Sequence, residues 1–166
     1  MKSVYSLTAI DWSANLIMDY FKFKNNTLYC EDVPVKKIAE KYGTPLFIYS
    51  QKTILGHFSK LKKAFRRINP LICYSVKANS NLSVLKLLVN SGAGLDIVSG
   101  GELYRAKKVN CPAKKIVYAS VGKSEEEIRA ALSEDIFMFN VESLNELTRS
   151  DKIAKRLAKK ARVSLR

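Results

Sequence analysis

The chain has 166 residues, of which 47% are hydrophobic and 27% are charged, a balance typical of a globular rather than a disordered protein. This length is sufficient for one domain of ordinary size with an apolar core. No uninterrupted apolar run approaches the ~18 residues that a membrane-spanning helix requires. Asp11 also interrupts the short apolar stretches at the N-terminus before any site typical of signal-peptide cleavage. We therefore expect a cytoplasmic protein without a membrane partner.

The formal net charge of +14 raises the question of an acidic partner. Nucleic-acid-binding proteins usually concentrate such an excess on one arm or face, whereas here it is spread over both halves of the chain. A solvated helical face is the simpler interpretation of the densest cluster, and we expect no nucleic-acid partner. Acidic residues in a portion of the protein outside this chain would also balance the charge. The cluster consists of Lys60, Lys62, Lys63, Arg66 and Arg67.

The three cysteines, Cys30, Cys73 and Cys111, are odd in number and lack a C-x-x-C spacing. This pattern disfavours both a disulfide framework and a zinc site. We expect reduced thiols and no metal.

The N-terminal part divides into two segments. Residues 1–17 fit no repeating pattern and precede Met18, a natural start, so we interpret them as an upstream extension. Residues 18–44 predict two short strands, 20–23 and 27–30, around an Asn25-Asn26 turn. A short helix from Val35 follows, with Gly43 as its C-terminal cap.

From residue 45 onward, strand-like apolar runs alternate with helical patterns. Ile54, Phe58, Leu61, Phe65 and Ile68 recur at spacings of four and three, as on one face of an amphipathic helix. The expected strands are 45–49, 71–76, 95–98, 116–119, 136–139 and 162–165, and further helices are expected near 82–88, 100–109, 124–134 and 143–160.

Three of these helices begin with the same S-x-x-E pattern, at Ser99–Glu102, Ser124–Glu127 and Ser143–Glu146. In this capping box the serine oxygen and the glutamate carboxylate each accept a hydrogen bond from a free backbone N–H group. Strands buried on both faces and joined by helices predict a parallel α/β sheet, either open and doubly wound or a barrel.

The sequence ends at Arg166 inside a strand pattern without a closing helix. We interpret this ending as a truncation and expect the chain alone to be inactive.

Lys77 lies where the expected strand 71–76 gives way to a loop. Side chains at the carboxyl ends of parallel strands point to the place where ligands bind. A lysine backed there by apolar walls would lose hydration and could attack an aldehyde to form a Schiff base. The alternative is a solvated lysine after a strand, which is common.

Several motifs, in matching order and spacing from about Met18 to Arg166, resemble the fold-type III pyridoxal-phosphate-dependent decarboxylases. V-K-A-N alone is a weak signal, but G-x-G-x-D and S-G-G-E-L follow it at the expected distance. The motifs are Tyr42 to Tyr49, Tyr74 to Asn79, Gly92 to Asp96, Ser99 to Leu103, and Asn140 to Ser143.

The resemblance implies a (β/α)8 TIM-type barrel like that of alanine racemase. About its first five strands would lie in residues 45–166, and pyridoxal 5′-phosphate would be held by Lys77. It also implies that Asp96 and Arg166 lie near the cofactor, with Arg166 a candidate partner for the Asp96 carboxylate. Glu102 and Asn79 are secondary candidates, and a capping role for Glu102 is an equal alternative.

Within this family we expect decarboxylation of meso-diaminopimelate to L-lysine by a homodimer. Ornithine, arginine and carboxynorspermidine are alternative substrates. Alanine racemase, a non-catalytic cofactor-binding barrel and an inactive product of an interrupted gene are further alternatives.

Overall fold

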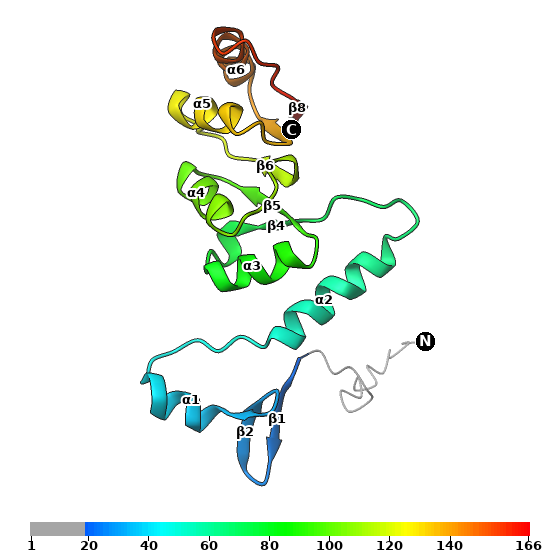
Figure 1. Ribbon diagram of the computed structural model, residues 1–166, viewed down its shortest axis with the longest axis vertical. Helices are drawn as coiled ribbons and strands as arrows, with labels where there is room; N and C mark the ends of the chain where they lie inside the picture. The colour runs from blue at the N-terminus through cyan, green and yellow to red at the C-terminus, as the bar shows by residue number, and fades with distance from the viewer. Residues whose placement is uncertain (1–18) are drawn as a thin grey trace, which may run out of the picture. The chain divides into compact units, whose positions relative to one another are not determined.

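The computed structural model describes residues 19–166, so the predicted upstream extension, residues 1–17, lies outside the described residues. Contacts divide the chain into two units, Met1–Ile54 and Leu55–Arg166. Figure 1 shows their helices and strands.

The described part of the first unit contains the predicted hairpin. Strands β1 (Phe21–Lys24) and β2 (Thr27–Cys30) pair antiparallel, with Lys24 opposite Thr27. Asn25 and Asn26 have φ values of 47° and 57°, the left-handed conformation that a two-residue hairpin turn requires. A third strand, β3 (Val33–Pro34), pairs with β2 and was not predicted.

Helix α1 (Val35–Tyr42) ends as predicted at Gly43, whose φ of 81° suits a residue without a Cβ atom. The predicted strand 45–49 is wrong, because these residues form no ladder with any strand in the described part of the chain. The segment is apolar in composition, but its backbone is not paired with another strand, and its Phe47 side chain is 89% exposed.

Helix α2 (Gln51–Ala64) confirms the predicted amphipathic helix but ends before Phe65 and Ile68. None of its residues is fully buried: Ile54 and Phe58 on its apolar face are half-buried, and Leu61 is exposed. Side chains from the first unit support its first turn. Glu31 Oε1 accepts hydrogen bonds from the Ser50 hydroxyl at 2.9 Å and from the Lys52 N–H at 2.8 Å. The Lys52 N–H group, followed by the Ser50 hydroxyl, holds the pKa of Glu31 below its usual range.

The second unit contains a five-stranded sheet in the order β4-β5-β6-β7-β8, with every neighbouring pair parallel. This confirms the predicted α/β class and parallel pairing, and the arrangement is that of consecutive units of an α/β barrel. Figure 1 shows α4, α5 and α6 following one another beside the strands. The strands are β4 (Cys73–Ser75), β5 (Gly94–Ile97), β6 (Ile116–Tyr118), β7 (Met138–Val141) and β8 (Val163–Leu165). The helices are α3 (Leu82–Asn90), α4 (Gly100–Lys108), α5 (Glu125–Ser133) and α6 (Leu144–Arg156).

Several predicted boundaries differ from the structure by one to four residues, and two of these differences have a local cause. Strand β7 begins two residues after the predicted position, because Asp135 has a φ of 55° and Ile136 still bonds back to α5 through the Ala131 carbonyl. Helix α6 ends four residues early, at Arg156. The Ala158 φ of 52° and the bond from the Lys159 N–H to the Ala154 carbonyl close it.

The core lies between the sheet and its helices. Leu95 and Ile97 of β5 are fully buried, whereas Asp96 between them is only half-buried. Tyr118 and Phe139 continue this layer, with stacked rings whose centroids lie 6.1 Å apart. The prediction that the strands are buried on both faces is therefore wrong for the described residues. One face packs on the helices, and alternate side chains project to the other face.

Candidate functional site

The sheet face opposite the core lines a cavity of about 790 Å³. Its lining comes from alternate strand residues and from the segments at the carboxyl ends of the strands. Three of the predicted site residues, Lys77, Asp96 and Arg166, lie on its wall together. The other lining residues are Leu71, Cys73, Val98, Val117, Ala119, Ser120, Val121, Met138, Asn140 and Glu142.

Lys77 lies in the turn that follows β4. The strand ends at Ser75, and a single 3-10 turn, Val76–Ala78, carries the chain out of the sheet. Val76 is fully buried and anchors this turn, while Lys77 next to it is exposed. The structure thus places Lys77 at the carboxyl end of a parallel strand. The expected apolar walls do not cover it in the described part of the chain.

Asp96 and Arg166 share the cavity but do not pair with each other. Arg166 Nη1 donates to Glu142 Oε1 at 3.0 Å, and Asp96 has no ion-pair partner among the described residues. The expected Asp96–Arg166 pair is therefore absent here. The two residues do not pair because Glu142 follows β7, the strand next to β8, whereas Asp96 lies on β5, which is not adjacent to β8.

Glu102 and Asn79 do not line this cavity. Glu102 Oε2 accepts a hydrogen bond from the Val98 N–H at 2.7 Å, and the Ser99 hydroxyl accepts from the Glu102 N–H at 3.2 Å. Asn79 Oδ1 accepts from the Asn81 N–H at 3.0 Å, just before α3. Both side chains therefore stabilise helix starts, which for Glu102 agrees with the capping alternative.

The three S-x-x-E patterns all cap helices, but only Ser124–Glu127 forms the complete reciprocal box. In the other two, the glutamate carboxylate accepts a hydrogen bond from the backbone N–H of the residue that precedes the serine. Glu102 accepts from Val98, and Glu146 accepts from Glu142 at 3.1 Å.

Sequence reasoning missed a buried ion pair behind the cavity wall. Lys123 Nζ lies 2.6 Å from Glu146 Oε1, and the two side chains are 0% and 7% exposed. The only local signal was that Lys123 directly precedes the Ser124 cap and that Glu146 belongs to the next capping pattern.

Two thiols near the sheet have raised pKa values. Burial, and then the negative charge of Asp96, raise the pKa of Cys73 to about 11. Burial, and then the neighbouring Cys73, raise the pKa of Cys111 to about 11. Both are free thiols, as the sequence predicted, and no cluster suited to a metal ion occurs among residues 19–166.

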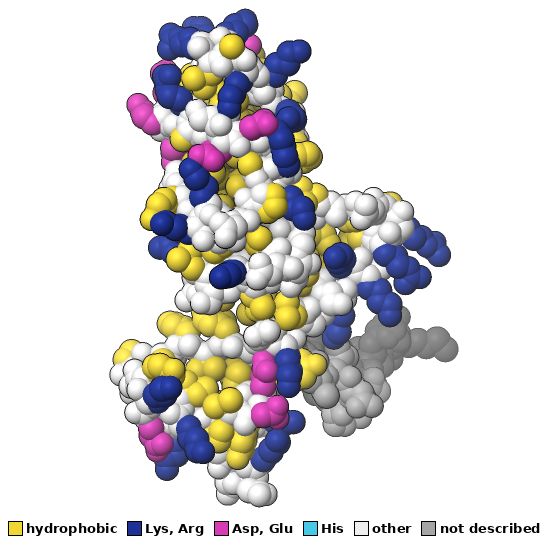
Figure 2. All heavy atoms as spheres, in the orientation of Figure 1, with side chains coloured by type: hydrophobic (Ala, Val, Ile, Leu, Met, Phe, Trp, Pro, Cys, Tyr) yellow, Lys and Arg dark blue, Asp and Glu magenta, His cyan; other side chains and the backbone are white. Residues whose placement is uncertain are grey.

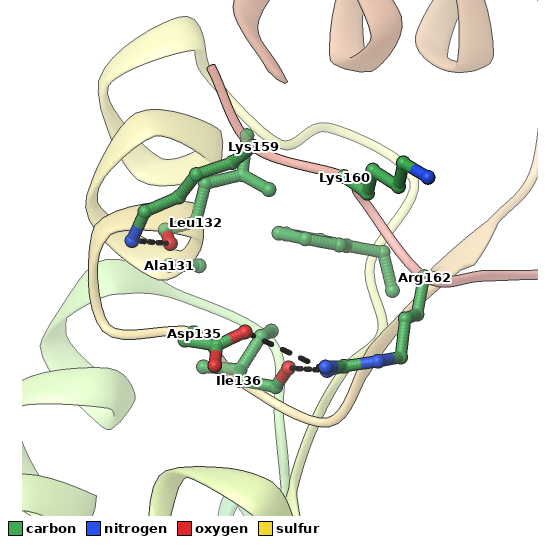
Figure 3. A pocket seen from close by; sticks show the side chains of 8 residues that line it. Ala131, Leu132, Asp135, Ile136, Lys159, Lys160 and Arg162 are labelled. Carbon is green, nitrogen blue, oxygen red and sulfur yellow. Dashed lines mark hydrogen bonds and ion pairs between the residues drawn. The ribbon is translucent and has the colours of Figure 1, made fainter. Parts of the chain in front are cut away.

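A smaller hollow of about 290 Å³ lies between the end of α5 and the segment before β8 (Figure 3). Lys159 Nζ donates to the Leu132 carbonyl at 2.7 Å, and Arg162 lies 3.6 Å from Asp135. Lys114 is the main cause of the lowered pKa of Asp135. Lys159 and Arg162 are thus paired with carbonyl oxygens and with the Asp135 carboxylate, and the hollow marks where the segment before β8 meets the end of α5.

Basic side chains are scattered over the visible face of the molecule, with a group near the end of α2 (Figure 2). No helix in the part of the chain described by the structure is long and apolar enough to cross a membrane.

Comparison with known proteins identifies the family. The chain is 49% identical over 140 residues to diaminopimelate decarboxylase of Neisseria meningitidis serogroup B, which covers 84% of this chain and 34% of that protein. The Aquifex aeolicus diaminopimelate decarboxylase is 49% identical over 147 residues, covering 89% of this chain and 34% of that protein. The chain thus spans about a third of the length of the curated relatives that it matches.

A crystal structure of diaminopimelate decarboxylase from M. jannaschii in complex with L-lysine superposes with a TM-score of 0.86 at 37% identity. It covers 89% of this chain, which spans 35% of that protein. Residues 51–166 match the model of the family described as pyridoxal-dependent decarboxylase, pyridoxal binding domain. The chain belongs to this family of pyridoxal-dependent decarboxylases.

Proposed function

We propose that this chain supplies part of the pyridoxal-phosphate site of a diaminopimelate decarboxylase, with Lys77 as the residue that holds the cofactor. The observation that carries the proposal is the joint placement of Lys77, Asp96 and Arg166 around one cavity at the carboxyl ends of parallel strands. The 49% identity to two diaminopimelate decarboxylases supports the choice of substrate.

The residues around the cavity suit this cofactor chemically. An aldehyde requires a primary amine, which Lys77 offers on an exposed turn. A charged heterocycle with a phosphate requires both signs of charge, which Asp96 and the Arg166–Glu142 pair provide. The half-buried Asp96 carboxylate has no ion-pair partner among the described residues, so it is available to a positive charge or a hydrogen-bond donor of the bound ligand.

When bound, pyridoxal phosphate supplies an electron sink for the electron pair left behind when a carboxylate departs as carbon dioxide. The chain's own residues would hold and orient the reactants. Lys77 would fix the aldehyde carbon at the mouth of β4. Asp96 would hold a positively charged or hydrogen-bond-donating group of the bound ligand near Lys77, because a nearby carboxylate favours the charged form of such a group.

We further propose meso-diaminopimelate as the substrate, L-lysine as the product and a cytoplasmic homodimer as the working assembly. These features follow the expectations from the sequence and the names of the relatives. Size-exclusion chromatography with light scattering tests the assembly.

Covalent trapping tests the role of Lys77. The chain is incubated with pyridoxal phosphate and reduced with borohydride, and the labelled lysines are mapped by mass spectrometry. We expect labelling of Lys77 at lower cofactor concentrations than labelling of Lys86, an exposed lysine on α3. Equal labelling of the two lysines would contradict the assignment.

The substrate is tested in a chimera that joins residues 19–166 to the remainder of the Aquifex aeolicus relative. We expect release of carbon dioxide from meso-diaminopimelate, loss of this activity in Lys77→Ala and its retention in Lys86→Ala. Turnover of ornithine or arginine in preference to diaminopimelate would favour the alternative substrates.

A further inference from the structure

The Lys123 ammonium is completely buried yet fully hydrogen-bonded. It donates to the Ser120 carbonyl at 2.8 Å, to the Asn140 carbonyl at 2.7 Å and to Glu146 Oε1 at 2.6 Å. Its charge also lies 5.7 Å from the centre of the Tyr118 ring. Three donors and three acceptors match, which is the condition for a charge to remain buried.

The partners of this ion pair belong to the cavity wall. Ser120 and Asn140, whose carbonyl groups bind Lys123, both line the cavity. Glu146 Oε2 accepts a hydrogen bond from the Glu142 N–H at 3.1 Å, and Glu142 is a third lining residue. One buried pair therefore holds backbone atoms of three wall residues from behind.

The segment after β6 requires such support. Ser120 has a φ of 134°, a conformation that residues with a Cβ atom rarely adopt. Strained backbone persists only where its surroundings fix it, and here the Ser120 carbonyl is fixed by the ammonium. The lining residues Ala119 and Val121 lie on either side of Ser120, so the shape of this wall depends on that bond.

We propose that the Lys123–Glu146 ion pair is a positioning element of the cavity wall, which sets the backbone of Ser120, Asn140 and Glu142 against the bound cofactor. The effect on the cofactor rests on the proposed function. The effect on the wall does not, so the two can fail separately. Lys123 itself does not line the cavity, and it therefore acts through the wall.

The double variant Lys123→Met/Glu146→Gln isolates this role. Lys123→Met alone leaves a buried, unpaired carboxylate and is expected to unfold the chain at a lower temperature. Removing both charges avoids that cost, and the amide introduced by Glu146→Gln keeps a carbonyl group that can accept the Glu142 N–H. The matched control is Lys155→Met/Asp151→Asn, which removes an exposed ion pair from α6, the helix that carries Glu146.

Amide hydrogen exchange of the 166-residue chain is the primary measurement. We expect residues 119–123 to exchange about tenfold faster in the double variant, while its Tm changes little. In the control variant neither the exchange of this segment nor the Tm should change. A uniform increase in exchange with a lower Tm would show a merely structural role and overturn the proposal. Unchanged exchange, or a segment 119–123 that is already unprotected in the wild type, would also overturn it.

Borohydride trapping with pyridoxal phosphate gives the second measurement. We expect the cofactor concentration that half-labels Lys77 to rise roughly tenfold in the double variant, because a small misplacement of the wall costs binding. Faster exchange without this rise would overturn the effect on the cofactor and leave the effect on the wall. Failure of the proposed function would instead appear as poor selectivity for Lys77 in the wild type.

Discussion

Arg166 donates a 3.0 Å hydrogen bond to the Glu142 carboxylate, and both side chains line the cavity that contains Lys77. Replacing Glu142 with Gln removes a negative charge from this wall and frees the guanidinium. Because pyridoxal phosphate is an anion, we expect Glu142→Gln to lower the half-labelling concentration at Lys77 by roughly threefold to tenfold. Asp151→Asn, an exposed change on α6, is the control and should have no effect. Weaker labelling in Glu142→Gln would contradict this prediction.

Cys73 reports on the charge of Asp96. Burial and then Asp96 raise the pKa of Cys73 to about 11, so few of these thiols are ionised at pH 8. Asp96→Asn should lower this pKa and accelerate alkylation of Cys73 by iodoacetamide a few-fold between pH 8 and 9. Cys111 is an internal reference, because its pKa of about 11 arises from burial and from Cys73. An equal acceleration at Cys111 would indicate general loosening instead.

Glu127 should contribute to stability in a pH-dependent way. Burial raises its pKa, but hydrogen bonds from the Ser124 and Gly100 N–H groups outweigh this effect and leave the pKa below its usual value. A lowered pKa in the folded state stabilises the fold above the unfolded pKa of about 4.3, and this contribution is lost as the pH falls through the folded value.

We therefore expect Glu127→Gln to lower the free energy of unfolding by about 1–2 kcal/mol at pH 7, and the difference to shrink below pH 4. Urea denaturation at several pH values measures it. Glu125→Gln is the control, because it changes an exposed carboxyl group in the same helical turn and leaves the hydrogen bonds of Glu127 in place.

Gly94 begins β5 and lies between Cys73 of β4 and the backbone just before β6. A Cβ atom there would be 2.4 Å from the Lys115 carbonyl oxygen and 2.8 Å from Cys73 Sγ. We expect Gly94→Ala to destabilise the chain by about 1–3 kcal/mol, because the backbone must move. Gly56→Ala has open space in the middle of α2 and should stabilise it by up to about 1 kcal/mol. Thermal unfolding compares the two variants, and equal shifts would contradict the steric argument.

Local patterns were sufficient for much of the fold. The serine caps at Ser99, Ser124 and Ser143 start α4, α5 and α6 as predicted, because each cap involves groups only a few residues apart. The strand at 45–49 failed for the opposite reason. A strand exists only through hydrogen bonds to a second strand, and for residues 45–49 no adjacent turn and no apolar pattern specifies which segment that would be.

The same distinction applies to the candidate site. The position of Lys77 after β4 follows from a local change of pattern. The partner of Arg166 depends on which carboxylate the folded sheet brings within reach. The Lys123–Glu146 pair joins residues 23 positions apart, and the place of each residue in a capping pattern does not distinguish a buried lysine from a solvated one.

The capping glutamate of α5 also accepts a 2.7 Å hydrogen bond from the Gly100 N–H at the start of α4, so one carboxylate serves two successive helices. Lys159, in the segment after α6, similarly reaches back to the Leu132 carbonyl in α5. Such links between neighbours make the second unit resemble a short linear array, whose stability is a sum of local terms and nearest-neighbour couplings. Unfolding should then proceed inward from β4 and β8, the outer strands of the sheet, and reach β6 last.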